Sequence, residues 1–225
     1  MEYMREILNE FKDEIEIPPD VMLELIQICL DFNIFDYNGS WYKQIQGLAM
    51  GSPLSPIIAC LYMESIEKKY ILPKLPPKTA WFRYIDDILF ICEEESQAEE
   101  VLNIINTIED PIKFTIEKEI NNSIPFLDVN IIKENDDVME FDVYRKSTNA
   151  ENYIHYFSAH PTKTKTGILI GFFLRAFRIC SYKYIDSEIT KIYDAFLKRG
   201  YSRLFINDAL KKAKAIFYNP KKEKN

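Results

Sequence analysis

The segment that decides the fold is residues 82–90, which read FRYIDDILF. Two runs of aromatic and aliphatic residues flank a pair of aspartates, which predicts an antiparallel hairpin with strands at 81–85 and 88–92. Adjacent carboxylates are a poor choice for a tight turn, where Asn-Gly or Asp-Gly is preferred and like charges repel. They become favourable where a divalent cation binds, so Asp86 and Asp87 form a candidate Mg²⁺ site. An ordinary exposed acidic turn is the alternative interpretation.

A loop rich in glycine, serine and proline lies upstream of this hairpin. Residues 46–56, QGLAMGSPLSP, lead into a predicted helix at 57–70. Gly47 and Gly51 permit close approach of the backbone to a ligand, and a helix N-terminus attracts phosphate. A loop in which Ser52 simply starts the helix is the alternative, but it leaves the two glycines unexplained.

The rest of the chain predicts an α+β fold, with an antiparallel sheet backed by helices and then a helical region. The dipeptide Asn38-Gly39 predicts a type I′ hairpin. Asp20 is expected to cap the second helix. Further helices are predicted at 2–15, 21–32, 96–108, 164–182, 186–199 and 202–217, and further strands at 113–119, 125–132 and 139–146.

Composition and charge narrow the class of protein. The 47% hydrophobic content allows a substantial core, and no apolar run is long enough to span a bilayer or to serve as a signal peptide. The four cysteines form no CxxC pair, which favours reduced thiols inside a cell. Residues 161–225 hold 15 Lys and Arg against 5 Asp and Glu, so this basic part is suited to a polyanion. A solvated lysine-rich terminus is the alternative.

Residues 46–56 followed by 82–90 resemble motifs B and C of reverse transcriptases. The sequence AMGSPLSP, with methionine at position 50, is most similar to the Penelope-like retroelement branch, which is related to telomerase catalytic subunits. The downstream segments FTIEKE, IPFLDVNI and FLRAFRICS resemble the same branch from motif D into the thumb.

The resemblance implies a domain organisation. A partial polymerase palm, a split βαβ antiparallel sheet with backing helices, would occupy residues 1–148, with motifs D and E at about 112–132. A helical, basic thumb would occupy residues 149–225, and this part is also similar to a helix-turn-helix domain. His155 and His160 have no cysteine close by in the sequence, which disfavours a zinc site.

The resemblance also implies roles for single residues. Asp86 would be the main metal ligand and Asp87 a supporting carboxylate. Tyr84 would face the primer terminus. Lys118 would protonate the leaving pyrophosphate, although a solvated strand lysine is an equal alternative. The incoming nucleotide and template would lie near four residues: Gln46, Gly51, Ser52 and Pro53.

Primer and duplex contacts are implied further along the chain. The region 126–128 would support the primer, although Phe126 and Leu127 are also suited to a core position. Phosphate contacts would come from the basic residues of the thumb, since a polymerase holds the backbone and does not read bases. The residues implied in these contacts are Phe126, Leu127, Lys163, Lys165, Arg175 and Arg178.

The implied activity is RNA-directed DNA synthesis by two-metal nucleotidyl transfer. A primer 3′-hydroxyl would attack a deoxynucleoside triphosphate, with Mg²⁺ or Mn²⁺, an RNA template and a DNA primer. Relatives carry a GIY-YIG endonuclease domain, and a nuclear location is expected. Motif A, with its bridging carboxylate, and the fingers are not found in residues 1–225, so we expect a fragment that is inactive or feeble alone. The alternative is a non-catalytic nucleic-acid-binding remnant; a protein-interaction scaffold explains less.

Overall fold

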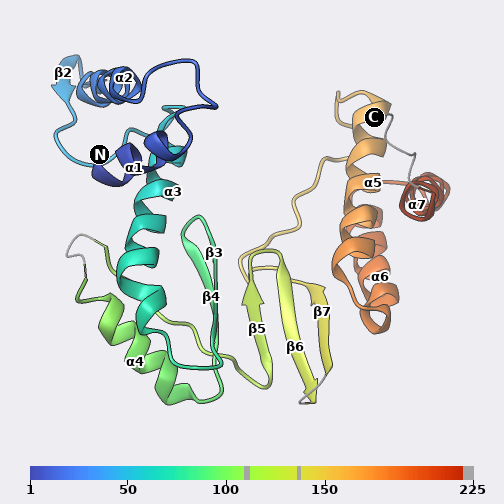
Figure 1. The fold of residues 1–225 in the computed structure, drawn as a ribbon. Coiled ribbons are helices and arrows are strands. Elements are labelled where there is room, and N and C mark those ends of the chain that lie inside the picture. Colours follow the sequence, from blue (N-terminus) through green and yellow to red (C-terminus); the bar gives the residue numbers. More distant parts are fainter. Residues whose placement is uncertain (109–111, 136–137, 220–225) are drawn as a thin grey trace. The chain divides into compact units, whose positions relative to one another are not determined.

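The computed structural model describes residues 1–108, 112–135 and 138–219. The chain divides into two compact units, a first unit at Met1–Ile116 and a second unit at Glu117–Asn225 (Figure 1). Small antiparallel sheets accompany helices, and the C-terminal region is helical, which confirms the predicted α+β class. Among these described residues, no helix is both long and apolar enough to cross a bilayer.

The first unit begins with two helices and an isolated hairpin. The helix α1 ends five residues before its predicted end, because residues 11–14 form a turn. Asp20, predicted as a cap, instead lies inside the first turn of α2, which Pro18 precedes. The first elements are α1 (Glu2–Glu10), α2 (Pro19–Asp31), β1 (Ile34–Tyr37) and β2 (Ser40–Lys43).

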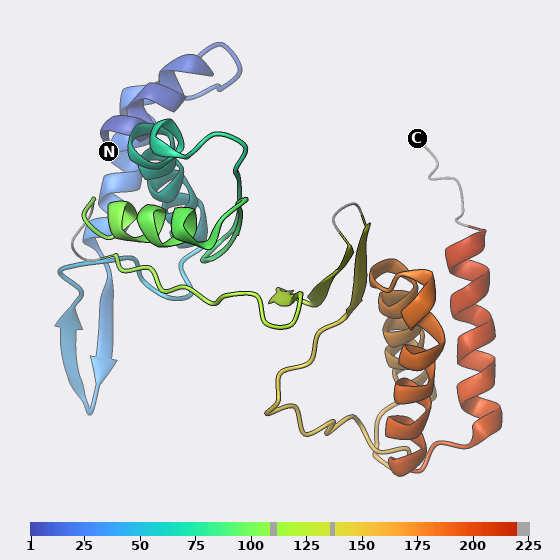
Figure 2. The same ribbon diagram turned by 90° about the horizontal axis from the view of Figure 1, so that it is seen from below.

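The β1–β2 hairpin forms at the predicted Asn38-Gly39 turn. Both turn residues have positive φ, 52° at Asn38 and 76° at Gly39, as a type I′ turn requires. Every strand residue of the hairpin is exposed, and the hairpin projects from the helices of the first unit (Figure 2). Its stability therefore depends on local pairing and on the stacking of Phe35 on Tyr42.

The remaining elements of the first unit surround a second hairpin. The helix α3 continues into a π-helical turn and a short 3₁₀ turn, which together cover the predicted helix at 57–70. The core is formed by Ile66, Ile71, Val101 and Ile105, with Trp81 and Phe90 packed against them. The elements are α3 (Ser55–Ile66), the π-helical turn Glu67–Ile71, the 3₁₀ turn Leu72–Lys74, β3 (Ala80–Tyr84), β4 (Asp87–Ile91) and α4 (Glu95–Ile105).

The sheet of the second unit differs from the prediction in two places. The described residues 112–119 contain no strand, so the strand expected at 113–119 is wrong. The single strand expected at 125–132 is a hairpin, because Leu127 adopts a φ of +53° and reverses the chain. The strands β5 (Ser123–Phe126), β6 (Val129–Asn135) and β7 (Val138–Val143) form one antiparallel sheet in the order β5-β6-β7.

Three helices complete the second unit and hold its core. Phe173, Phe196 and Ile206 are fully buried. Helix α5 packs against α7, and three fully buried alanines of these helices, Ala176, Ala209 and Ala213, belong to the same core cluster. The helices are α5 (Thr162–Ile179), α6 (Tyr182–Lys198) and α7 (Arg203–Tyr218), close to their predicted bounds.

The compact units divide the chain at a different place from the predicted domains. The sheet β5–β7 belongs with the helices, since the Ser181 amide donates to the Phe141 carbonyl and β7 packs against α5 and α6. The predicted division at 148/149 concerns which residues act as palm and thumb, and it stays a prediction. Residues 220–225 of the predicted thumb lie outside the described residues.

Candidate functional site

The two aspartates lie at the turn that joins β3 to β4. Tyr84 pairs with Asp87, so the turn consists of Ile85 and Asp86. The predicted loop of Asp86 and Asp87 is therefore displaced by one residue, because Ile85 adopts a φ of +56° and closes the turn early. Asp86 lies in the turn, and Asp87 is the first residue of β4. Both carboxylates are exposed.

The two faces of this hairpin differ in burial. Phe82 and Tyr84 lie on the outer face, where their side chains are 56% and 58% exposed. The inner face carries the cross-strand pairs Trp81–Phe90 and Arg83–Ile88, and Trp81 and Phe90 pack against the core of the first unit. Tyr84 and Asp87 are thus neighbours on the open face, and the predicted role of Tyr84 at the primer terminus stays a prediction.

A buried carboxylate holds the inner face in place. Glu67, in the π-helical turn after α3, accepts a hydrogen bond from Arg83 Nε at 2.7 Å and one from Trp81 Nε1 at 2.9 Å. The side chains of Arg83 and Glu67 are only 12% and 10% exposed. The hydrogen bond to Glu67 raises the pKa of Arg83 above its ordinary value.

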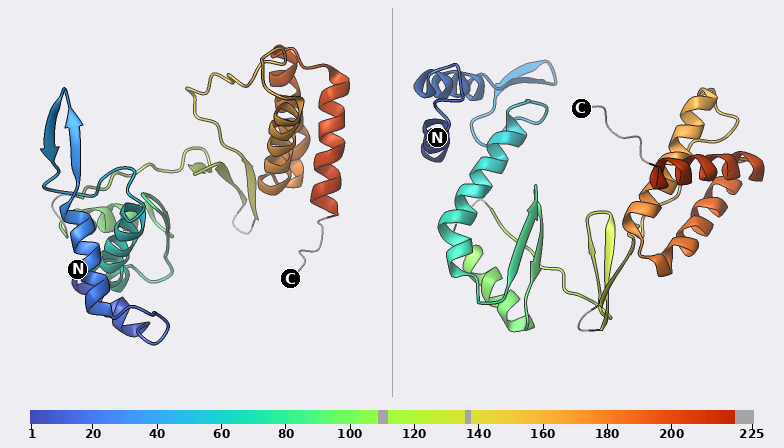
Figure 3. Two further views of the ribbon diagram at one scale, coloured as in Figure 1. Left: turned by 90° about the horizontal axis from the view of Figure 1, so that it is seen from above. Right: turned by 45° about the vertical axis from the view of Figure 1, so that its right-hand side comes forward.

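Arg83 also reaches the turn itself. Its Nη1 donates to the Ile85 carbonyl at 3.1 Å, and its Nη2 approaches the Cys60 carbonyl of α3 at 3.5 Å. The turn points to the end of the first unit at which α3 begins (Figures 1 and 3). This network was not predicted from the sequence. The signal for this network in the sequence is a charged residue at an inward-facing position of the strand predicted at 81–85, together with a glutamate in an apolar helix.

The loop before α3 has the backbone freedom that its glycines predict. Gly47 and Gly51 have φ of 79° and 90°, which residues with a Cβ rarely adopt. Ser55 Oγ donates to the Ala49 carbonyl at 2.6 Å and fixes the loop against the start of α3. Of the predicted nucleotide-binding residues, Gln46, Gly51 and Pro53 are exposed and Ser52 is half-buried.

The side chains of Asp86 and Asp87 are suited to supply some of the ligands of one divalent ion. Mg²⁺ is commonly held by one or two carboxylates together with substrate phosphates, and Asp86 and Asp87 supply two exposed carboxylates on a paired hairpin. Across residues 1–108, 112–135 and 138–219, no group of three or more His, Cys, Asp or Glu side chains is arranged to hold a metal ion. Among the described residues, Asp86 and Asp87 are therefore two candidate ligands, and their role as a metal site stays a prediction.

The remaining predicted site residues lie in the second unit. Lys118 is exposed in an extended segment. Phe126 ends β5, and Leu127 begins the turn to β6, where it is partly exposed. Nothing in this unit tests the predicted roles of these three residues, which remain predictions.

The basic residues predicted to contact duplex have different environments. Lys163 and Arg178 are exposed on α5. Lys165 is buried, and its ammonium group donates to the Ser158 carbonyl at 2.8 Å. Arg175 pairs with Asp128 at 3.0 Å. A phosphate contact is least favoured for Lys165, because its ammonium group is already hydrogen-bonded to a carbonyl inside the fold.

The comparisons with known proteins bear on the first unit and the helices separately. Residues 4–119, about half of the chain, match the reverse transcriptase (RNA-dependent DNA polymerase) family. The chain belongs to the reverse transcriptase family. In this reverse transcriptase chain, residues 152–211 additionally match the animal helix-turn-helix domain, as the similarity of the thumb segment predicts.

One curated relative is itself a reverse transcriptase. Telomerase reverse transcriptase of Euplotes aediculatus is 28% identical over 129 residues, which cover 52% of this chain. The matched part spans 12% of the telomerase protein. No solved structure shows a significant match to the chain.

Proposed function

We propose that this chain contributes motifs B and C, together with a helical nucleic-acid-binding region, to an RNA-directed DNA polymerase of a Penelope-like retroelement. The observation that carries the proposal is the pair Asp86 and Asp87, exposed at a hairpin turn that Arg83 ties to α3. The match of residues 4–119 to the reverse transcriptase family supports it. The sequence AMGSPLSP at 49–56 supports the assignment to the Penelope-like branch.

The chemistry is the transfer of a nucleotide to a primer. The primer 3′-hydroxyl loses its proton to water, its oxygen bonds to the α-phosphorus of a deoxynucleoside triphosphate, and the bond from that phosphorus to the pyrophosphate oxygen breaks. Asp86 is the main ligand for Mg²⁺ or Mn²⁺ and Asp87 supports it. The ion supplies charge stabilisation for the triphosphate. Tyr84, exposed beside Asp87, faces the primer terminus, and Lys118 donates the proton to the departing pyrophosphate.

The partners follow from the positions of the other residues. The exposed loop at 46–53 lies against the nucleotide and the RNA template, because its glycines let the backbone approach closely. Phe126 and Leu127 support the DNA primer, and exposed basic residues of α5 hold the duplex backbone. A GIY-YIG endonuclease domain and a nuclear location belong to the same proposal.

Residues 1–225 alone are proposed to be at best weakly active. Two-metal transfer needs a bridging carboxylate, which motif A supplies in the family that the sequence resembles. Without one of the two metal ions, its stabilisation of charge in the transition state is lost, which costs several kcal/mol. Each loss of about 1.36 kcal/mol slows the reaction tenfold. A strand carrying this aspartate, from upstream in the reading frame or from another chain, would complete the site.

Primer extension tests the proposal. Residues 1–225 are assayed with Mg²⁺, a primed RNA template and deoxynucleoside triphosphates, as wild type, Asp86→Asn and Glu93→Gln. We expect weak extension by wild type and by the Glu93→Gln control, and none by Asp86→Asn. Equal extension by Asp86→Asn would overturn the assignment of the site. Robust synthesis by wild type would overturn the proposed dependence on a further carboxylate.

Sequencing the transcript upstream of the Met1 codon tests whether the reading frame supplies that carboxylate.

A second candidate function rests on the helix-turn-helix match at 152–211. A remnant that only binds nucleic acid would use its basic helices and ignore the aspartates. Its binding to an RNA–DNA duplex would weaken with salt, and Asp86→Asn would leave the affinity unchanged. An Asp86-dependent extension product would exclude this candidate.

A further inference from the structure

The helix α2 carries apolar side chains on two opposite faces, at the end of the first unit that also carries the β1–β2 hairpin (Figures 1 and 3). Leu23 is buried on one face. On the other face, apolar residues recur at intervals of four, three and four positions, which aligns them along one side of a helix. Their exposed fractions lie between 45% and 72%. This α2 stripe consists of Val21, Leu25, Ile28 and Phe32, the last directly after the helix ends.

An exposed stripe of this kind indicates an interaction surface. A surface helix needs one apolar face to hold it on its own core, whereas a second, exposed apolar face is typical of a binding site. The stripe is about 16 Å long, or about three helical turns. Its spacing is the one through which a helix contacts another helix that lies along it. A partner that covers the stripe therefore removes a continuous apolar area from water.

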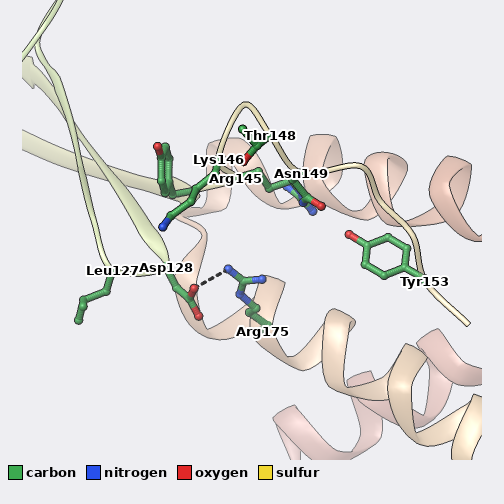
Figure 4. A pocket seen from close by; sticks show the side chains of 9 residues that line it. Leu127, Asp128, Arg145, Lys146, Thr148, Asn149, Tyr153 and Arg175 are labelled. Carbon is green, nitrogen blue, oxygen red and sulfur yellow. Dashed lines mark ion pairs between the residues drawn. The ribbon is translucent and has the colours of Figure 1, made fainter. Parts of the chain in front are cut away.

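A cavity of about 440 Å³ adjoins the stripe at Phe32. Six of its eight lining residues have apolar side chains. The cavity of the second unit, where Arg175 pairs with Asp128, is by contrast lined mainly by charged and polar side chains (Figure 4). An apolar cavity at the end of the stripe fits one large apolar side chain of a partner, as anchor residues do in other interfaces. The six apolar lining residues are Phe32, Ile34, Phe35, Leu48, Ala49 and Met50.

The charge around the stripe selects the kind of partner. Residues 13–42 contain seven Asp and Glu and no Lys or Arg. Three of these carboxylates lie along one edge of α2, each directly before a residue of the stripe: Asp20, Glu24 and Asp31. Asp20 pairs with Arg5, and Glu24 and Asp31 are exposed. This acidic edge attracts lysine and arginine side chains, and it repels the phosphates of nucleic acid and of anionic lipid.

We infer that the α2 stripe and the adjoining cavity dock a basic amphipathic helix of a partner protein. The apolar side chains of that helix cover the stripe, and its lysine or arginine side chains pair with Glu24 and Asp31. A second copy of α2 fits less well, because an antiparallel two-fold pair brings both acidic edges to the same side. The inference goes beyond the proposed function and does not involve Asp86, so either can fail without the other.

Peptide binding tests the inference. Fluorescence anisotropy, at about 0.1 M salt, measures the affinity of residues 1–225 for two labelled synthetic helices of about 18 residues. Both helices carry the same leucine stripe, and their polar positions are all lysine in one and all glutamate in the other. The variants of the surface are Leu25→Gln, Ile28→Gln and the double variant Glu24→Lys with Asp31→Lys.

Two controls lie outside the surface. Ile216→Gln changes an isoleucine of α7 that is 47% exposed, as Ile28 is. Glu100→Lys reverses an exposed charge on α4. Urea unfolding of all variants checks that they are folded, and the midpoints of Leu25→Gln and Ile28→Gln should equal that of wild type because both side chains are exposed.

The expected pattern is specific to α2. The lysine peptide binds wild type about tenfold more tightly than the glutamate peptide does, because only the former is attracted by the acidic edge. Leu25→Gln and Ile28→Gln each weaken binding of the lysine peptide about tenfold, since an apolar contact is lost. The double variant reverses the preference and favours the glutamate peptide. Both controls bind as wild type does.

Four results would overturn the inference. The first is that the lysine peptide does not bind wild type, or binds Leu25→Gln and Ile28→Gln as tightly as the Ile216→Gln control. The second is that the double variant keeps the preference for the lysine peptide. The third is a dimer of wild type, measured by analytical ultracentrifugation, that Ile28→Gln abolishes, which would assign the stripe to a second copy. The fourth is binding of a labelled single-stranded RNA that Ile28→Gln abolishes, which would assign it to nucleic acid.

Discussion

Arg83 Nε lies 2.7 Å from Glu67 Oε1, and the same guanidinium group donates to the carbonyl of Ile85 in the turn that carries Asp86. The glutamate follows α3, which begins directly after the glycine-containing loop. One side chain pair therefore fixes the turn of the candidate metal ligands relative to the helix of the candidate nucleotide loop. A change in either partner is expected to disturb both segments.

Glu67→Ala should destabilise the first unit. The change leaves Arg83 charged and largely buried without its partner, which costs about 3–5 kcal/mol. Urea unfolding followed by the fluorescence of Trp81, which packs in the same core, measures this loss. Lys78→Ala is the control, because its pair with Glu93 is exposed and contributes about 1 kcal/mol or less.

A double variant separates burial of charge from packing. Glu67→Leu with Arg83→Met replaces the pair by apolar side chains of similar size, and we expect most of the stability to return. If Glu67→Ala unfolds at the same urea concentration as Lys78→Ala, the pair does not hold the hairpin.

Ile85→Asn should stabilise the β3–β4 hairpin. A φ of +56° is costly for a β-branched residue, by about 1–2 kcal/mol, whereas asparagine tolerates this region. Little buried area is lost, because Ile85 is 59% exposed. The unfolding free energy is expected to rise by about 1 kcal/mol. Asn38→Ile, the reverse change at a φ of 52° in the β1–β2 turn, should lower it, and equal signs for the two variants would contradict the argument.

Glycine-to-alanine changes should have opposite effects in two places. Gly51 has a φ of +90°, and Gly171 lies within α5; an added Cβ would meet no atom within 4 Å at either position. The backbone alone then decides the outcome. Gly51→Ala is expected to cost about 1–2 kcal/mol, whereas Gly171→Ala should add about 1 kcal/mol because alanine favours a helix. Thermal unfolding of both variants, followed by far-UV circular dichroism, measures these changes.

The thiol of Cys180 gives a pH-dependent prediction. Burial, together with the nearby carboxylate of Asp142, raises the pKa of Cys180 from 9.0 to about 12. The folded state therefore favours the neutral thiol, so the contribution to stability is complete below pH 9 and is lost as the pH rises toward 12. The difference in unfolding free energy between wild type and Cys180→Ala should fall over this range.

Thiol labelling provides an independent check at pH 8. The exposed Cys29 and Cys60 should react first with a disulfide reagent, and the half-buried Cys92 more slowly. Cys180 should react only after denaturation. Rapid labelling of all four thiols in the native protein would show that Cys180 is accessible.

Turn chemistry explains which hairpins can be predicted from the sequence. Asn38 and Gly39 each tolerate positive φ, so the local sequence specifies the β1–β2 turn. Leucine has no such preference, and the turn at Leu127 exists because β6 pairs with both β5 and β7. A similar tertiary effect closes the β3–β4 turn at Ile85 and moves Asp87 into the strand. The identity of the candidate ligands follows from the sequence, but their register in the hairpin does not.

Long-range pairs explain what remains hidden in the sequence. Arg83 and Glu67 are 16 residues apart, and Arg175 and Asp128 are further apart still. Charge counts identify Arg175 as basic, but only folding places an exposed carboxylate beside it and leaves its Nε without a partner among the described residues. Lys165 illustrates the reverse, since a lysine near the start of α5 donates to the Ser158 carbonyl inside the fold.

The alanines between α5 and α7 have a consequence for how this chain tolerates variation. Ala176, Ala209 and Ala213 are fully buried in the core of the second unit, where a larger side chain is expected to overpack and destabilise. In a saturation library, only glycine and serine should survive at these three positions, and each costs stability. These small residues therefore restrict which substitutions the chain tolerates, as the large buried Phe173 does. They also limit how far apart the helices that carry the basic residues can lie.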